Sequence, residues 1–495
     1  MATQHPDNAC PSWISGKRFI SAQEEIEECY RCFSELGVQE FMWDWEGKFV
    51  DEAVIDRLYS EYRDYFKKHQ IGKDLFITFR VPNIWIESTH KLPRAFMNMI
   101  SAEDAAKTYG FHRPPLFEAI LPMTTSAAQL EYLQKTFLKT VKATAEIFDI
   151  KSSLKILNLI PLFEEFETMA DAKSILHTYV DFLKKEYNYK PEYLRIFIAR
   201  SDPAMNAGFL PAKLACKHAI SAYHEFSKET GIAVYPWVGG GSLPFRGGIN
   251  PENIEAILEE FRGVATVTIQ SAFRYDYPLD RVKKAIARLN KQLPVNRLKP
   301  VMLSHAEGEE IKSFNREAAK YYKKTIESVA DLINIVAGKL PNHRERVQHV
   351  GLFGYSRGVG KVKLPRAIKF TGALYSLGVP PELIASGRAL LHAKKMGILP
   401  LIRKLCPYLK EDFIHAGHYL NRENLDLLCK KNKAWVEVRS EIDAIEDIIG
   451  VNIGPDQHHH IIHRNLTSTI YHKLNLHEDF SVEVLQAAEI RRSLG

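Results

Sequence analysis

The sequence has few cysteines, and their spacing predicts neither disulfide bonds nor a structural metal site. Six cysteines are dispersed over 495 residues. Cys29 and Cys32 form a single C-x-x-C within a polar stretch of helical character, and no second pair accompanies them, which disfavours a zinc site or dithiol redox chemistry. We therefore expect reduced thiols in a cytoplasmic protein.

Long apolar runs, blocks of like charge and nucleotide-binding loops are also missing. No apolar run approaches the ~18 residues of a membrane span, and the polar N-terminal stretch gives no targeting signal. The formal net charge of +6 is small, and no Lys/Arg block predicts nucleic-acid binding, although a mild positive excess suits a cleft that collects small anions. The sequence has no G-x-x-x-x-G-K-[ST] match, which excludes a nucleotide P-loop. These absences favour a soluble protein that acts on a small anionic ligand.

The sequence does contain a regular series of short apolar runs separated by stretches of helical periodicity. Most of the runs are apolar throughout, as parallel strands covered on both faces require. Their rhythm predicts an α/β fold of the (β/α)8 TIM type, with the eighth strand either at residues 347–353 or in the N-terminal segment. The seven clear runs are residues 41–45, 75–80, 117–123, 154–163, 194–200, 233–238 and 264–270.

The character of the chain changes after about residue 278, where long helical stretches at 310–338 and 381–450 replace the strands. We expect residues 1–278 to form the barrel with most active-site loops. Residues 279–495 then form a mainly helical region packed on the barrel, which contributes a glycine-rich loop at 351–368 and the C-terminus. The run His458-His459-His460, with His463, could bind a metal ion, but we favour an exposed polar loop.

Polar or glycine-rich segments follow six of the predicted strands, at 79–83, 121–126, 161–164, 199–208, 237–248 and 270–278. Barrel enzymes build their active sites at the carboxyl ends of the strands. Glu164 and Asp202 end two successive strands, and a right-handed βαβ connection places both on the same edge. Two carboxylates there suit Mg²⁺ or Mn²⁺, although such residues serve equally well as helix caps or in salt bridges.

Arginines near the strand ends favour the metal-site interpretation. A guanidinium group binds phosphate and carboxylate through paired hydrogen bonds, so a set of them implies a substrate that carries both groups. The loop at 239–248 is so rich in glycine that we interpret it as a mobile lid that carries an arginine over the substrate. The arginines on strand-end loops, or flanking the second glycine-rich loop, are Arg80, Arg246, Arg274, Arg357 and Arg366.

Taken together, the motifs resemble the phosphoenolpyruvate carboxylase family, in particular its short archaeal-type form. In chain order they are TQHPDN, PLFE, RSDPA-x-N, GSLPFRGG, QSAFRYDYP and GYSR…LPRAI, and they cover nearly the whole chain. The resemblance implies carboxylation of phosphoenolpyruvate with bicarbonate to oxaloacetate and phosphate, through carboxyphosphate and pyruvate enolate. It also implies Mg²⁺ or Mn²⁺ as cofactor, a cytoplasmic homotetramer, and neither nucleic-acid nor membrane partners.

The same resemblance implies roles for individual residues. It makes Glu164 and Asp202 the metal ligands and His5 the base of the carboxylation step. The other catalytic residues that it implies are Arg246, Arg274 and Arg357. The substrate-binding residues are Arg80, Arg366, Gly247, Gly248 and Ser493.

The sequence departs from the long form of the family at three positions. The first loop arginine of the long form falls at about Gly239, its lysine after the metal aspartate at Met205, and its C-terminal asparagine at Ser493. Two rival functions stay open: another phosphoenolpyruvate/pyruvate-type barrel lyase or phosphotransferase, and a non-catalytic binding protein on the same scaffold. The absence of a recognisable swivelling phosphohistidine domain disfavours the phosphotransferase, and the presence of the metal ligands and the base disfavours the binding protein.

Overall fold

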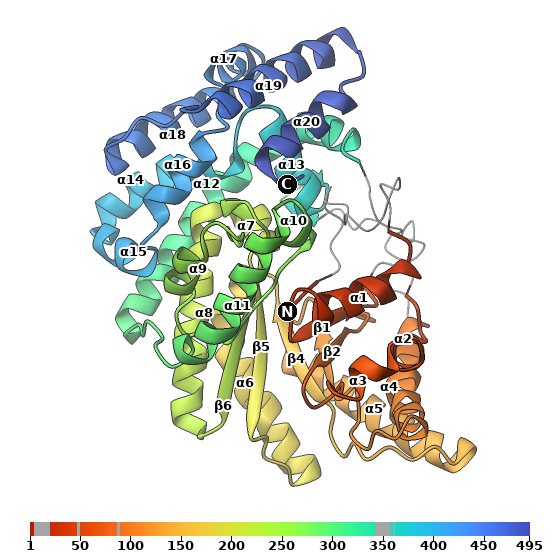
Figure 1. Ribbon diagram of the computed structural model, residues 1–495. Coiled ribbons are helices and arrows are strands. Elements are labelled where there is room, and N and C mark those ends of the chain that lie inside the picture. The colour runs from red at the N-terminus through yellow and green to blue at the C-terminus, as the bar shows by residue number, and fades with distance from the viewer. Residues whose placement is uncertain (4–19, 47–49, 87–89, 342–356, 360–361) are drawn as a thin grey trace.

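The computed structural model describes residues 1–3, 20–46, 50–86, 90–341, 357–359 and 362–495. His5 and the candidate eighth strand at 347–353 therefore lie outside the described residues. Figure 1 shows an α/β protein in which a sheet surrounded by helices occupies one part and a mainly helical region occupies the other.

The seven predicted runs form the seven strands of one parallel sheet, and the strands lie in sequence order. Each predicted run overlaps one strand, so the α/β prediction is confirmed. All five residues of the first strand are buried, as expected for a strand covered on both faces. The strands are β1 (Glu40–Asp44), β2 (Phe76–Arg80), β3 (Glu118–Leu121), β4 (Asn158–Phe163), β5 (Tyr193–Ala199), β6 (Ala233–Gly239) and β7 (Thr266–Val267).

The first three residues lie between the two outer strands of this sheet. Ala2 forms parallel bridges to Phe41 of β1 and to Ile269, just beyond β7. The Ala2 N–H donates to the Glu40 carbonyl at 2.9 Å, and the Thr3 N–H donates to the Ile269 carbonyl at 3.1 Å. The N-terminal segment therefore runs in the direction of the strands and leads toward their carboxyl ends.

Helices alternate with the strands, as the helical periodicity of the intervening stretches predicts. Helices α5 and α6, for example, follow β3 and β4. The helices of this part are α1 (Glu24–Ser34), α2 (Val54–Glu61), α3 (Arg63–Phe66), α4 (Lys91–Thr108), α5 (Ala127–Phe148), α6 (Phe166–Tyr187), α7 (Ser201–Ala207), α8 (Phe209–Thr230), the 3-10 turn η1 (Pro244–Arg246), α9 (Ile254–Glu260), α10 (Ser271–Tyr275) and α11 (Leu279–Asn296).

The remaining described residues are mainly helical, as predicted for the region after residue 278. A capping box between Ser304 and Glu307 begins its longest helix, α12. The elements are α12 (His305–Gly338), a hairpin of β8 (Arg357–Val359) and β9 (Val362–Leu364), α13 (Ala367–Ser376), the turn η2 (Pro381–Leu383), α14 (Ser386–Met396), α15 (Leu399–Leu405), α16 (Leu409–Gly417), α17 (Arg422–Lys431), α18 (Lys433–Ile449), α19 (His458–Leu476) and α20 (Ser481–Arg491).

Side chains from several strands meet in one cluster that is separate from the core beneath the covering helices. Its members come from β1 and from β3 to β6. The Phe197 and Trp237 rings of β5 and β6 stack at 3.9 Å between centroids. Because these strands share an interior cluster on one face and pack against helices on the other, the sheet is curved around that interior.

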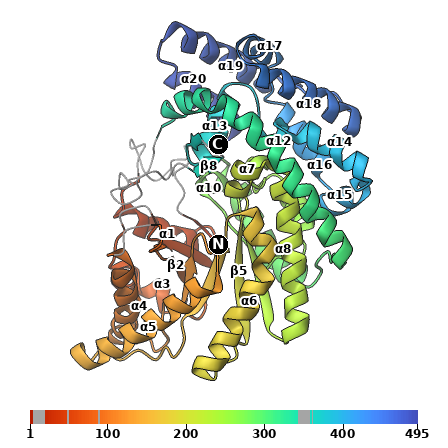
Figure 2. The same ribbon diagram turned by 180° about the vertical axis from the view of Figure 1, so that it is seen from behind.

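The helical region packs over the end of the sheet at which α7 and α10 begin (Figures 1 and 2). Residues of α7 and α8 share one hydrophobic core with α12 to α20. Buried Lys213 of α8 forms an ion pair with Asp412 of α16 and another with Glu260 of α9 at 3.1 Å. The helical region therefore covers the carboxyl edge of the sheet, where the sequence predicts the site.

Among the described residues, no helix combines the length and the apolar character needed to cross a membrane.

Candidate active site

Glu164 and Asp202 lie at the carboxyl ends of neighbouring strands. Phe163 of β4 pairs in parallel with Ile198 of β5. Glu164 directly follows β4 and is 4% exposed, and Asp202 lies in the first turn of α7, just after β5. The predicted adjacency of the two strands is confirmed. The donor set fits a hard divalent ion, because both groups are oxygen ligands on one edge and one of them is already withdrawn from solvent.

Gly208 allows the short helix that carries Asp202 to end before α8 begins. Its φ of +96° is a conformation that residues with a side chain rarely adopt. A Cβ atom at Gly208 would also lie 3.0 Å from the Tyr322 ring of α12. A glycine here thus permits the sharp turn that places α7 across the strand ends.

Arg80 is fixed at the end of β2 by acidic neighbours. Its guanidinium donates to both carboxylate oxygens of Asp44, at 2.9 and 2.6 Å, and forms a 3.0 Å ion pair with Glu46. Burial by itself lowers the pKa of Arg80, but Asp44, Glu46 and, more weakly, Glu164 raise it well above its usual value. Arg80 therefore stays charged, and it lies within electrostatic reach of the candidate metal ligand Glu164.

The sequence-based candidates did not include Asp44 and Glu46, although both are almost fully buried at the carboxyl end of β1. The signal was present in the sequence as Asp44-Trp45-Glu46, directly after an apolar run. Glu46 also lies 3.9 Å from Arg366, the N-cap residue of α13. This carboxylate therefore joins a strand-end arginine to an arginine of the helical region.

Arg246 lies in the turn η1 of the glycine-rich loop that we interpret from the sequence as a mobile lid. Here the arginine is 2% exposed and therefore packed into the protein. Its guanidinium donates to the Gln270 Oε1 atom at 2.6 Å, to the Ser201 Oγ atom at 3.2 Å and to the Gly495 carbonyl. These three hydrogen bonds hold the loop in place, because Ser201 follows β5, Gln270 follows β7 and Gly495 lies far away in the sequence.

Glycines of this loop make room for close packing around Arg246. A Cβ atom at Gly241 would lie 2.6 Å from the Arg246 Cζ atom. Gly247 and Gly248 have φ values of +124° and +69°, which favour glycine. At Gly239, a Cβ atom would collide with the Phe197 ring. An arginine at Gly239, as in the long form, is therefore incompatible with this packing, and Met205 at the lysine position is fully buried in α7.

The C-terminal residues reach Arg246 through a buried chain of contacts. Ser493 is 1% exposed, and its hydroxyl donates to the Gly495 carbonyl at 3.1 Å. Arg491 donates to the Leu494 carbonyl at 3.2 Å and to the His463 Nε2 atom at 2.8 Å. A Cβ atom at Gly495 would collide with the Ile368 carbonyl of α13. The end of the chain thus fits a slot next to the site in which a side chain has no room.

Arg274 of α10 has a fully buried side chain that joins the N-terminal segment to α1. Its guanidinium donates to the Thr3 carbonyl at 2.7 Å and to the Cys32 Sγ atom at 2.9 Å, and it forms a 3.2 Å ion pair with Glu28. Thr3 is the last described residue before His5. Arg274 therefore holds the chain at the carboxyl edge two residues before the candidate base.

Two candidate residues have no described side-chain environment. His5 lies outside the described residues. Arg357 begins β8, and only the backbone pairing of that strand with β9 is described. Their roles stay predictions from the sequence.

Glu382 of the helical region holds the η1 turn by a hydrogen bond to its backbone. It accepts from the Phe245 N–H at 2.7 Å and from the Tyr375 hydroxyl at 2.8 Å. Burial raises the pKa of Glu382 to about 7, although these hydrogen bonds act in the opposite direction. The folded protein therefore binds a proton at Glu382 in a pH range where the unfolded chain has lost it.

This shift predicts that stability falls as the pH rises. Between the unfolded pKa near 4.5 and the folded pKa near 7, the folded state retains a proton that the unfolded state releases. The parent protein should therefore lose up to about 3 kcal/mol of unfolding free energy, relative to Glu382→Gln, as the pH rises from 4.5 to 8. Denaturant unfolding of both proteins across this range measures the difference, and a constant difference would contradict the ionisation of Glu382.

Comparison with known proteins gives one consistent family. The family described as "Phosphoenolpyruvate carboxylase" matches residues 1–495. The phosphoenolpyruvate carboxylase of Leuconostoc mesenteroides subsp. mesenteroides is 44% identical over 458 residues, which cover 92% of this chain and 90% of that protein. The enzyme of Oenococcus oeni is 41% identical over 477 residues, covering 95% and 93%. The enzyme of Metallosphaera sedula is 38% identical over 526 aligned residues, covering 100% and 99%.

Proposed function

The chain belongs to the phosphoenolpyruvate carboxylase family, in its short archaeal-type form, and carboxylates phosphoenolpyruvate to oxaloacetate; from this premise we propose how its residues perform the reaction. The observation that carries the proposal is that Glu164 and Asp202 follow adjacent parallel strands at the edge covered by the helical region.

Glu164 and Asp202 hold one Mg²⁺ or Mn²⁺ ion through their carboxylate oxygens. When bound, such an ion neutralises charge that develops on phosphate and enolate oxygens. The burial of Glu164 supports this role, because a withdrawn carboxylate gains more from a cation than an exposed one does. Arg80 lies nearby and is held by Asp44 and Glu46, so it adds a fixed positive charge on the same edge.

Arg246 binds the phosphate or carboxylate of phosphoenolpyruvate. Ser201, Gln270 and the Gly495 carbonyl hold its guanidinium in a fixed orientation, which reduces the reorganisation needed when charge develops during the reaction. Substrate binding then replaces one or more of these hydrogen bonds. Gly247 and Gly248 permit the left-handed backbone conformations of the same loop, while Ser493 positions the Gly495 carbonyl.

Two further arginines complete the anion site in this proposal, and a third positions the N-terminal segment. Arg366, the N-cap residue of α13, lies near Glu46, which also forms an ion pair with Arg80. In this proposal Arg366 contributes to substrate binding. Arg357 brings a guanidinium from the β8–β9 hairpin of the helical region. Arg274 acts as a positioning residue, because its buried contacts are with Thr3, Cys32 and Glu28.

His5 is the base of the second half-reaction. Bicarbonate first attacks the phosphorus of phosphoenolpyruvate, which gives carboxyphosphate and pyruvate enolate. His5 then takes the carboxyl proton of carboxyphosphate, so that phosphate leaves and CO₂ is released beside the enolate, whose carbon attacks it. The buried packing of the η1 turn supports this scheme, since excluding water protects the enolate from protonation.

The architecture supports a division of labour between the two parts of the chain. We place the strands of residues 1–278 in a (β/α)8 barrel in which the N-terminal segment is the eighth strand, as its bridges to both outer strands suggest. Residues 279–495 supply Arg357, Arg366 and the C-terminus. Helix α11 of this second part packs into the same core as the sheet.

Neutralising either metal ligand should remove most activity without unfolding the protein. We expect Glu164→Gln and Asp202→Asn to lower oxaloacetate formation at least about a hundredfold, because each removes a charged ligand of the ion. A coupled assay with phosphoenolpyruvate, bicarbonate and varied Mn²⁺ measures rate and metal requirement together. Glu165→Gln is the matched control, since Glu165 is the exposed neighbour of Glu164.

The proposal also requires a weaker apparent affinity for Mn²⁺ in both variants. Parental rates and an unchanged Mn²⁺ dependence in both Glu164→Gln and Asp202→Asn would contradict the metal assignment. The same assay on the parent protein, with and without bicarbonate, checks that oxaloacetate is the product.

A further inference from the structure

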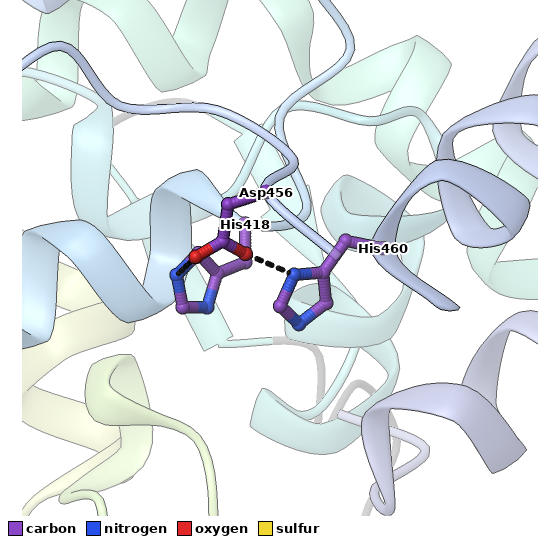
Figure 3. Close-up of side chains that lie close together, drawn as sticks. All are labelled: His418, Asp456 and His460. Atoms are coloured by element: carbon purple, nitrogen blue, oxygen red, sulfur yellow. Dashed lines mark hydrogen bonds and ion pairs between the residues drawn. The ribbon is translucent and has the colours of Figure 1, made fainter. Parts of the chain in front are cut away.

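We propose that His418, Asp456 and His460 form a second metal site, for a borderline transition-metal ion such as Zn²⁺, within the helical region. Figure 3 shows the three side chains converging, with the Asp456 carboxylate between the two imidazoles. The ligand atoms that they offer all lie within 4.8 Å of one another. The three residues come from the C-terminal end of α16, the loop before α19 and the first turn of α19.

The contacts already resemble those of a metal site before an ion is bound. The His460 Nδ1 atom lies 2.6 Å from one Asp456 oxygen, and the His418 Nε2 atom lies 3.4 Å from the other. The two imidazole rings stack at 4.3 Å between centroids with an angle of 17°. Ligands about 2.1 Å from a tetrahedral ion lie about 3.4 Å apart, and the two stacked rings must turn so that the ion lies in the plane of each imidazole.

The two histidines are more buried than the aspartate, so the aspartate has the most room to move. The His460 and His418 side chains are 5% and 19% exposed, whereas the Asp456 side chain is 57% exposed. The two histidines supply a pair of nitrogen ligands, and the exposed aspartate, which already contacts His460, has room to move onto an ion. Burial also lowers the pKa of both histidines, which favours the neutral imidazoles that metal ions require.

The chemistry of the donors separates this site from the one proposed for catalysis. Two imidazole nitrogens and one carboxylate suit Zn²⁺, Co²⁺ or Ni²⁺, whereas Mg²⁺ prefers oxygen ligands. Three protein ligands leave a fourth position for water. The site lies on α16 and α19, whereas Glu164 and Asp202 follow β4 and β5, so this inference does not depend on the proposed catalytic roles.

Binding would fasten α16 to the start of α19. His463, one turn after His460 on the same helix, accepts a hydrogen bond from Arg491, which in turn donates to the Leu494 carbonyl. An ion at the cluster would therefore stabilise the helix that supports the C-terminal segment. We expect this as a rise in melting temperature when the metal is present.

Co²⁺ is the probe for this site, because nitrogen ligation in a four-coordinate site gives strong visible absorption. We expect the full-length parent protein, stripped with a chelator and held in excess Mg²⁺ to occupy carboxylate sites, to bind one Co²⁺ per chain and to melt at a higher temperature with Co²⁺. The double variant His418→Ala/His460→Ala should lose the bound Co²⁺, the visible band and the thermal shift. Asp456→Asn should weaken binding at least tenfold while retaining both histidines.

The matched control is the double variant His458→Ala/His459→Ala, which removes two exposed histidines of the same run and keeps the three ligands. It should bind Co²⁺ as the parent does. Equal Co²⁺ binding by the parent and by His418→Ala/His460→Ala would overturn the proposal, and so would loss of binding in the control or no binding to the parent. If His418→Ala/His460→Ala does not fold, the Co²⁺ affinities of Asp456→Asn and of the control variant are compared instead. Equal affinities would then overturn the proposal.

Discussion

Arg246→Ala is expected to lower oxaloacetate formation by about a hundredfold to a thousandfold, the usual cost of removing one preorganised group that stabilises transition-state charge. The expectation rests on the orientation of the guanidinium, which Gln270, Ser201 and the Gly495 carbonyl hold from three sides. Arg246→Lys should fall almost as far, because lysine retains the charge but not the planar pair of donors. Steady-state kinetics on both variants give the measurement.

The control for Arg246 must allow for stability, because the residue is buried and its removal leaves polar partners unpaired. Arg388→Ala provides this control. Arg388 lies on α14 and binds Glu437 at 2.6 Å together with Glu441 and Thr325, so its loss also removes several hydrogen bonds. At a temperature where both variants are folded, Arg388→Ala should retain parental activity. Equal activities of Arg246→Ala and Arg388→Ala would contradict the role of Arg246.

His5→Asn is expected to separate the two half-reactions. If His5 acts only after carboxyphosphate has formed, bicarbonate should still attack phosphorus, and phosphoenolpyruvate should still be cleaved to pyruvate and phosphate. Oxaloacetate should fall at least about a hundredfold, since general-base assistance contributes 10²- to 10⁴-fold. The assay measures pyruvate and oxaloacetate on the same variant, in the presence and absence of bicarbonate.

Each other outcome for His5→Asn has a definite meaning. Unchanged oxaloacetate would show that His5 is not the base, and loss of both products would show that it binds substrate or shapes the site. His112→Asn serves as control, because His112 is an exposed histidine in the loop before β3. It should leave both products at parental levels.

The sheet could be predicted from the sequence because its strands are buried on both faces. In β4, for example, Leu159 to Phe163 are all buried and form a continuous apolar run. The N-terminal segment was harder to assign, because among its described residues only Ala2 forms the bridges, and the neighbouring sequence carries no strand pattern. Its position depends on the open edges of β1 and β7, which no local pattern reveals.

The positions of site residues that directly follow strands could be predicted from the sequence. The positions of residues that are fixed by contacts with sequence-distant parts of the chain could not. Glu164 and Asp202 follow apolar runs, so their common edge could be inferred. The burial of Arg246 could not, because its partner Gly495 lies 249 positions away in the sequence. Glycine-rich loops usually read as mobile, and here the glycines instead allow tight packing.

The histidine cluster shows the same limit. The sequence drew attention to residues 458–460 with His463, and an exposed polar loop was favoured over a metal site. His418 lies 42 positions before His460 and reaches it because His418 and Tyr419, which follow α16, pack against the first turns of α19. His458 and His459 are exposed, but the run begins helix α19 and does not form a loop, and His460 and His463 are buried, so the loop interpretation is wrong.

The most direct test of the account is the position of the catalytic ion. Crystals of the protein soaked with Mn²⁺ should show an anomalous peak between Glu164 and Asp202, about 2.1 Å from a carboxylate oxygen of each. That peak should be absent from crystals of Asp202→Asn at the same Mn²⁺ concentration. An ion bound elsewhere on the strand-end edge, with the two carboxylates directed away from it, would contradict the central claim that these residues hold the metal.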